Sequence, residues 1–208
     1  MILSLAHRFV FIKTIKTAGS SVEVALSELC EAAAAVTPLY PPEPRHQPRN
    51  FAALGFEPHM GAAAIRQRIG PALWDRLAKI TVERNPWDKM VSWYGWQRHL
   101  AGLDCDFSTF IGRCAERGRW PYLFPAAAEL YTIAGATCLD RVIRFERLEE
   151  DFAAAFGDIF AVGARALPRA KVGHRPAGAD YRAFYDAATS ARVAQRYARE
   201  ISLFDYAF

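Results

Sequence analysis

Six consecutive residues combine a cation, small side chains and hydroxyl groups where a strand-like run turns into a helix-like one: Lys16, Thr17, Ala18, Gly19, Ser20 and Ser21. The start of a helix leaves backbone N–H groups without helical partners and carries partial positive charge, which suits a phosphate or sulfate dianion. The turn is not a Walker A loop, because that motif needs an earlier glycine and residues 9–15 contain none. The pattern therefore predicts a phosphate-like ligand, with an ordinary surface lysine as the alternative reading of Lys16.

A second group of polar residues follows another strand-like run, at 80–82. Asn85-Pro86 suits the N-cap and first position of a helix, which places Arg84 at the carboxyl end of a strand, where open α/β sheets bind ligands. Ser92 lies about two turns, roughly 10 Å, along this helix, and Asp88 lies one turn before it on the same face. Arg84 could instead pair with a neighbouring carboxylate, and Ser92 could be an ordinary surface serine.

Together the two segments resemble the sulfotransferases that use 3′-phosphoadenosine 5′-phosphosulfate, in particular the carbohydrate-type branch. Members carry a Pro-Lys-Thr-Ala-Gly-Thr-Ser-like loop after the first strand and a later Arg-Asn-Pro-x-Asp-x-x-x-Ser segment. Residues 84–92 match the second motif at every fixed position, whereas Ile15 and Ser20 replace the usual proline and threonine of the first. Residues 142–152 resemble the family's RFE-x-L-x-x-DF segment and 197–208 its aromatic terminus, so the likeness spans almost the whole chain.

The resemblance implies a binding role for three sets of residues. The 5′-phosphosulfate of the donor would be held by Lys16, Thr17, Ala18, Gly19, Ser20 and Ser21, and the 3′-phosphate by Arg84 and Ser92. Lys171 and Arg175 would close over the 3′-phosphate, as a C-terminal loop does in this family. A solvated loop is the alternative for these last two residues.

His59 and Lys16 form the expected catalytic set. In sulfuryl transfer an acceptor hydroxyl attacks sulfur in line, so the enzyme must remove a proton, align the reactants and neutralise charge. His59 precedes a helix, at the place where the glycosaminoglycan-modifying branch often carries a base histidine, and imidazole accepts a proton at neutral pH. A surface or capping role is the alternative for His59, and Glu57 is the alternative base. The leaving group is already a good one, so no metal is expected.

Length and composition favour one soluble enzyme domain spanning 1–208. The net charge of +4 and pI near 9.0 suit a polyanionic ligand, but the basic residues are scattered and no nucleic-acid surface is expected. The N-terminal region contains no long apolar stretch, so neither a signal peptide nor a membrane anchor is expected. The four cysteines have no paired or metal-binding spacing, so a reducing, cytoplasmic setting is expected. Cys30 and Cys114 fall on apolar helical stripes and are expected to be core thiols.

Strands alternating with helices predict an α/β fold, a small parallel β-sheet sandwiched by α-helices, and the resemblance adds a P-loop-NTPase-like sulfotransferase arrangement. The expected strands are apolar, β-prone runs at 9–12, 80–82 and 142–145. Helical stripes begin near residues 22, 61, 71, 86, 107 and 148. Proline-rich or glycine-rich loops are expected at 36–50, 118–125 and 167–179.

Two other functions stay open. A P-loop-type small-molecule kinase shares the strand–turn–helix logic, although the missing glycines and magnesium ligands count against it. A non-catalytic nucleotide- or glycan-binding relative is the other alternative, and the presence of both Lys16 and His59 favours an active enzyme over it. The acceptor is expected to be a hydroxyl or amine of a carbohydrate or glycoconjugate, chosen by loops 36–50 and 118–130, which the motifs do not reach.

Overall fold

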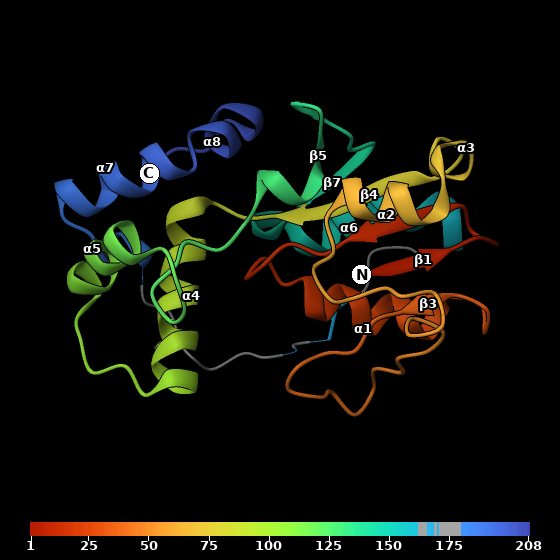
Figure 1. The fold of residues 1–208 in the computed structure, drawn as a ribbon, viewed down its shortest axis with the longest axis horizontal. Helices are drawn as coiled ribbons and strands as arrows, with labels where there is room; N and C mark the ends of the chain where they lie inside the picture. The colour runs from red at the N-terminus through yellow and green to blue at the C-terminus, as the bar shows by residue number, and fades with distance from the viewer. Residues whose placement is uncertain (162–165, 169, 171–179) are drawn as a thin grey trace. The chain divides into compact units, whose positions relative to one another are not determined.

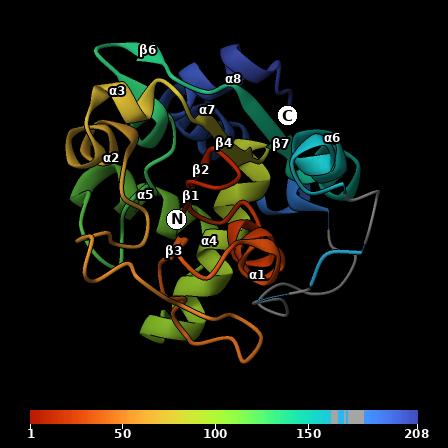
Figure 2. The same cartoon turned by 90° about the vertical axis from the view of Figure 1, so that its right-hand side faces the viewer.

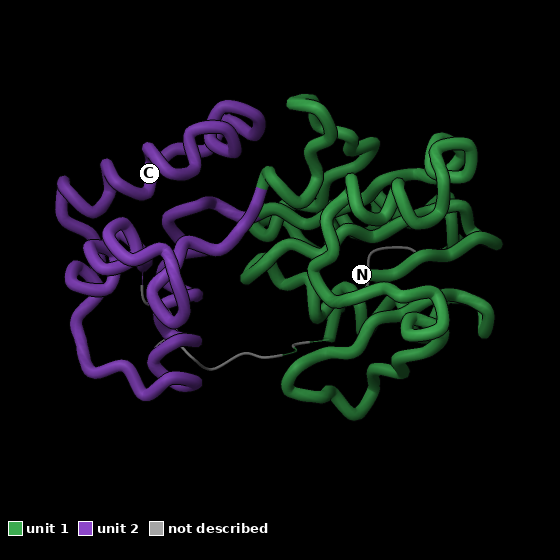
Figure 3. Tube along the Cα trace, viewed as in Figure 1, with its two compact units in different colours: residues 1–83, 128–171 green, residues 84–127, 172–208 purple. Residues whose placement is uncertain are grey.

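The structure is a computed structural model that describes residues 1–161, 166–168, 170 and 180–208 (Figure 1). The chain forms two compact units, one made of residues 1–83 and 128–171 and the other of residues 84–127 and 172–208 (Figure 3). The organisation of 1–208 as a single domain remains a prediction. Among the described residues, no helix has both the length and the apolar character that a membrane crossing requires.

The first unit is built on a five-stranded sheet in the order β3-β1-β2-β4-β7. Its strands are β1 (Ile2–Ser4), β2 (Phe9–Ile12), β3 (Ala35–Val36), β4 (Ala78–Glu83) and β7 (Arg141–Arg144). β2, β4 and β7 run parallel, as the sequence predicts, with Phe11 opposite Ile80 and Ile80 opposite Arg141. β1 runs antiparallel to both of its neighbours, so the sheet is mixed rather than wholly parallel. The physical reason is the short turn from β1 to β2, which permits only an antiparallel pair.

Helices cover both faces of this sheet, as expected (Figure 2). They are α1 (Gly19–Leu29) and α6 (Leu148–Phe160) on one face, and α2 (Ala62–Ile69) and α3 (Pro71–Trp74) on the other. The unit also contains the short helices η1 (Ala128–Tyr131) and η2 (Phe145–Arg147), and a hairpin of β5 (Thr132–Ile133) and β6 (Ala136–Thr137).

The main core lies between the sheet and helices α1 and α6. Alternate strand residues point to this face, because side chains in a strand change sides at every residue. The fully buried members include Phe9, Phe11, Ile80, Val82 and Ile143 from the strands, Val22, Ala25 and Leu26 from α1, and Phe152 and Phe156 from α6. Burial of this apolar surface holds α1 against the sheet and thereby fixes the turn that precedes the helix.

The second unit is helical. Its elements are α4 (Pro86–Ala101), α5 (Phe107–Arg117), η3 (Tyr181–Phe184), α7 (Ala187–Arg196) and α8 (Ala198–Phe204). Asn85 is the N-cap of α4, as the sequence predicts, since its side-chain oxygen accepts from the N–H groups of Trp87 and Asp88. The Asn85 amide also donates to the carbonyl of Ala207 at 2.9 Å, and the Trp87 indole donates to that of Ser190 at 3.1 Å. These contacts fix the start of α4, where the second predicted anion site lies.

Candidate functional site

The turn between β2 and α1 is anchored by two buried threonines. The Thr14 hydroxyl donates to the carbonyl of Val82 in β4, and its oxygen lies 2.8 Å from the Thr17 hydroxyl oxygen. A hydroxyl has one hydrogen to donate, so Thr17 is the donor to Thr14. The Thr17 hydroxyl is therefore directed into the protein, and any contact of Thr17 with a ligand would involve its backbone.

Two residues of the turn, Lys16 and Ala18, have left-handed backbone conformations, with φ of 63° and 69°. This region is uncommon for residues other than glycine and typically marks a tight or functional turn. The chain here also packs closely, because a Cβ on Gly19 would lie 3.0 Å from Cγ of Lys13. A side chain at position 19 would therefore press on Lys13, which explains the glycine.

α1 begins directly after this turn, at Gly19. The N–H groups of Ser21 and Val22 both donate to the carbonyl of Ala18, at 2.9 and 3.3 Å. Gly19 and Ser20 occupy the first two helical positions, where helix geometry provides no carbonyl one turn earlier for their N–H groups. The helix thus begins within the turn, and Lys16 is half-buried beside its start. Anion binding there stays a prediction.

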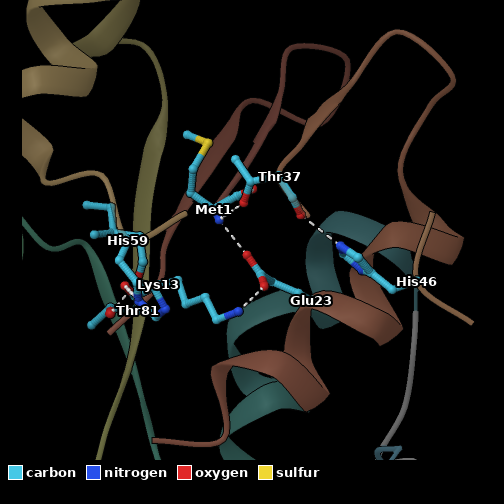
Figure 4. A network of polar contacts seen from close by, with 8 residues as sticks. Met1, Lys13, Glu23, Thr37, His46, His59 and Thr81 are labelled. Carbon is cyan, nitrogen blue, oxygen red and sulfur yellow. Dashed lines mark hydrogen bonds and ion pairs between the residues drawn. The ribbon is translucent and has the colours of Figure 1, made fainter. Parts of the chain in front are cut away.

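Lys13, a second lysine just before the turn, does not extend into solvent. Its ammonium lies 2.6 Å from Oε2 of Glu23 in the second turn of α1, and both side chains are buried (Figure 4). The amino group of Met1 contacts the other oxygen of the same carboxylate. Burial by itself would raise the pKa of Glu23, but the two cations outweigh it and lower that pKa to about 2. Glu23 is therefore ionised across the physiological range and lies between the Lys13 ammonium and the Met1 amino group, whose own pKa is lowered by burial.

His59 lies against the same turn. Its Nδ1 is 3.1 Å from the carbonyl oxygen of Lys13. A carbonyl can only accept, so Nδ1 carries the hydrogen and the neutral ring keeps its lone pair on Nε2. Burial, together with the charge of Lys13, lowers the pKa of His59 to about 4. At neutral pH the ring is thus uncharged and has one nitrogen able to accept a proton. Glu57, the alternative base, is exposed.

The described end of the predicted basic loop reaches this site as well. The N–H of Ala170 donates to the Ser21 hydroxyl at 3.2 Å, and Leu167 is buried in the main core. Ser21 Oγ thus accepts a hydrogen bond from the C-terminal part of the first unit. Lys171 and Arg175 lie outside the described residues, and their closing role stays a prediction.

In the second unit, Arg84 pairs with Asp88. Its Nε and Nη2 atoms lie 2.7 and 2.6 Å from the same carboxylate oxygen, and the two side chains are only 8% and 11% exposed. The pairing that the sequence left open for Arg84 is thus present, and it orients the guanidinium at the start of α4. Ser92, one helical turn beyond Asp88, is half-buried. The binding roles of Arg84 and Ser92 stay predictions.

No cluster of three or more potential metal-ligating side chains occurs in the part of the chain that the structure describes. The four cysteines are all free thiols, and Cys114 is a buried core residue, as expected. Burial raises the pKa of Cys114 and of Cys30 to about 12. Neither thiol is therefore a reactive nucleophile at neutral pH.

The first unit thus brings together the 16–21 turn and His59, which the sequence singles out separately. The sequence does not predict the part played by Lys13 and Glu23. Its one signal is a lone carboxylate, Glu23, between Val22 and Val24 in a mostly apolar segment of the predicted helix. A charge in such a position needs a buried partner.

Comparison with protein-family models and with curated proteins gives no match. Among solved structures, the chain is similar to one described as a sulfotransferase from Alicyclobacillus acidocaldarius. The two are 16% identical, the match covers 97% of this chain and 96% of that one, and the TM-score is 0.48. A likeness of this degree carries no functional argument, which has to come from the residues of this chain.

The environment of His59 predicts its titration. We expect the imidazole signals of His59, followed by NMR against pH, to titrate near pH 4, whereas the same residue in the urea-unfolded chain should titrate near its ordinary value of about 6.5. Between these values the unfolded chain binds more protons, so the contribution of His59 to stability falls as the pH falls through that window. A folded-state midpoint near 6.5 would contradict the buried, carbonyl-bound position.

Proposed function

We propose that the protein is a sulfotransferase that moves the sulfuryl group of 3′-phosphoadenosine 5′-phosphosulfate to a hydroxyl or amine of an acceptor, with a carbohydrate or glycoconjugate as the acceptor class. One observation carries the proposal. A helix start suited to an anion lies at the end of the 16–21 turn, and a neutral histidine with an accepting nitrogen is held by the carbonyl of Lys13, just before that turn. Group transfer from an anionic donor to a hydroxyl needs these two elements together.

The 16–21 turn would hold the 5′-phosphosulfate. The N–H groups of Gly19 and Ser20 at the start of α1 would donate to its oxygens, and the Lys16 ammonium would neutralise their charge. The donor supplies the activated sulfuryl group, and the turn supplies charge stabilisation that does not need to reorganise. Lys16 therefore has both a binding and a catalytic role in this proposal.

Arg84 and Ser92 would hold the 3′-phosphate of the same nucleotide. Support comes from the complete Arg-Asn-Pro-x-Asp-x-x-x-Ser motif and from the capped, rigid start of α4. Asp88 would act here by orienting the guanidinium, which it grips through two N–H groups. An arginine held in this way loses little side-chain freedom when it binds a phosphate.

His59 would act as the general base. As the acceptor oxygen attacks sulfur, its proton would pass to Nε2, while the bond from sulfur to the leaving phosphate oxygen breaks. The hydrogen bond from Nδ1 to the Lys13 carbonyl would stabilise the imidazolium that forms. A pKa of about 4 makes His59 a weak base in the free protein, but one that is already deprotonated at neutral pH. A bound anion nearby would raise this pKa and strengthen the base.

Ligand stabilisation provides the first test. We expect 3′,5′-adenosine bisphosphate without magnesium to raise the thermal unfolding midpoint, and ATP, with or without magnesium, to do so much less. At about 100 times its Kd the bisphosphate should add roughly 2.7 kcal/mol of stability. Lys16→Met should reduce the shift, and Arg76→Met, which removes an exposed charge from the same unit, should not. Equal shifts with the two nucleotides would favour a kinase over a sulfotransferase.

Arg84 provides the second test. Since removal of Arg84 alone would leave Asp88 buried without its partner, the informative variant is Arg84→Gln with Asp88→Asn. Calorimetry should show wild type binding the 3′,5′-bisphosphate more tightly than adenosine 5′-monophosphate. Loss of a charge-assisted hydrogen bond worth about 1.5–3 kcal/mol should remove most of this preference. Ser92→Ala should have a smaller effect. If the double variant still binds the 3′,5′-bisphosphate more tightly than adenosine 5′-monophosphate, Arg84 has only a structural role.

His59 provides the third test. After acceptor screening of saccharides with radiolabelled donor, His59→Gln should lower kcat by about 100- to 10,000-fold, while bisphosphate binding stays unchanged. The wild-type kcat/KM should stay flat as the pH is lowered to about 5 and decrease as the pH approaches 4, because only the neutral ring accepts a proton. Glu57→Gln is the control and should retain full turnover. If Glu57→Gln is inactive and His59→Gln is active, Glu57 is the base.

A further inference from the structure

Lys13 connects three parts of the candidate site. Its ammonium pairs with Glu23 of α1, its Cγ packs beneath Gly19 at the start of the same helix, and its carbonyl accepts the Nδ1–H of His59. Figure 4 shows the side chains of Lys13, Glu23 and His59 in this arrangement, with the Met1 amino group on the far side of the carboxylate.

The Lys13 backbone is also held on both sides by β4. The Ile12 carbonyl accepts from the Thr81 hydroxyl, and the Thr14 hydroxyl donates to the Val82 carbonyl. The ion pair adds a further constraint, one that a ligand has no need to contact.

The ring orientation of His59 depends on this backbone in turn. A neutral imidazole can carry its hydrogen on either nitrogen, so an unprotonated Nε2 is not guaranteed without a partner that selects it. The carbonyl of Lys13 selects the form with hydrogen on Nδ1, because a carbonyl cannot donate. A shift of this carbonyl would release the ring to rotate or to exchange its hydrogen between the two nitrogens.

We propose that the buried Lys13–Glu23 ion pair is a positioning device for His59, which holds the Lys13 carbonyl where it fixes the imidazole with Nε2 available. Lys13 and Glu23 act through His59 and through the turn, and neither is a catalytic residue. The functional meaning of this arrangement rests on the proposed role of His59 as a base. The arrangement itself can be measured without any ligand.

The charges of the pair support this assignment. An isolated carboxylate in the second turn of α1 would oppose anion binding at the start of that helix. Lys13 and the Met1 amino group neutralise Glu23, so the helix start and Lys16 keep their attraction for an anion. The same three groups also affect the pKa of His59. Lys13 and the Met1 amino group lower it and so favour the neutral ring, whereas Glu23 raises it. Burial is the largest cause of the lowered pKa of His59, and the charge of Lys13 adds to it.

The test follows the tautomer of His59 by two-bond ¹H–¹⁵N NMR of the histidine rings, with the signals assigned by comparison with His59→Gln. Wild type should show a protonated Nδ1 and an unprotonated Nε2 at pH 7. Lys13→Met keeps the side-chain stem beneath Gly19 and leaves Glu23 paired with the Met1 amino group, so it should fold. In this variant the Nδ1–H form should lose its predominance, and kcat should fall at least tenfold, a larger factor than any loss of bisphosphate affinity.

Two controls separate positioning from general stability. Lys13→Arg retains a cation for Glu23 and should restore both the tautomer and most of the rate. Arg141→Met removes another ion pair of the same unit, Arg141–Asp158, and should leave the His59 spectrum unchanged. If Lys13→Met does not fold, Glu23→Gln is examined by the same spectrum and should show the same change.

Each result decides the proposal. A wild-type ring with hydrogen on Nε2 overturns it at once, whatever the variants do. A folded Lys13→Met protein with the wild-type His59 spectrum also overturns it, because the ion pair is then only structural. If the tautomer responds as expected but the bisphosphate does not bind, the positioning device stands and the sulfotransferase assignment fails.

Discussion

The burial of Glu23 is the constraint on which the first unit depends. A carboxylate inside a protein must be paired, and here both of its oxygens meet cations, Lys13 on one side and the Met1 amino group on the other. This requirement brings the chain before the turn against the helix after it. The turn between them is then closed, with left-handed residues at Lys16 and Ala18. The start of α1, where the sequence predicts an anion site, and the contact of His59 with the Lys13 carbonyl both lie at this closure.

Side-chain hydrogen bonds hold this turn in its tight conformation, whereas a Walker A loop relies on several glycines for a tight turn. Thr14 ties it to the neighbouring strand through Val82, and Thr17 ties it to Thr14. A single glycine, Gly19, remains where the chain packs most closely. The proposed anion site therefore has a loop sequence unlike that of a Walker A loop, so the proposed function rests on the groups at the helix start rather than on a glycine pattern.

Local patterns explain what could be predicted from the sequence. The apolar run at 9–12 and the Asn85-Pro86 helix start are set by neighbouring residues, and both occur as expected. β1 was missed because three residues give no clear period. The Thr14–Val82 hydrogen bond joins residues 68 positions apart, and the pairing of Lys13 with Glu23 depends on how α1 folds back. Such tertiary contacts leave no periodic signal. The binding roles of residues 16–21, Arg84 and Ser92 stay predictions.

The hydrogen bond from Ala170 to Ser21 has a consequence for how the protein is made. It joins residues 149 positions apart, so the start of α1 meets its last described partner only after most of the chain has left the ribosome. Closing so long a segment is costly in chain entropy, and such contacts form late in folding. The N-terminal turn therefore lacks this hydrogen bond during most of synthesis. A nascent chain that has finished β4 has the anchor for Thr14 but not yet this contact.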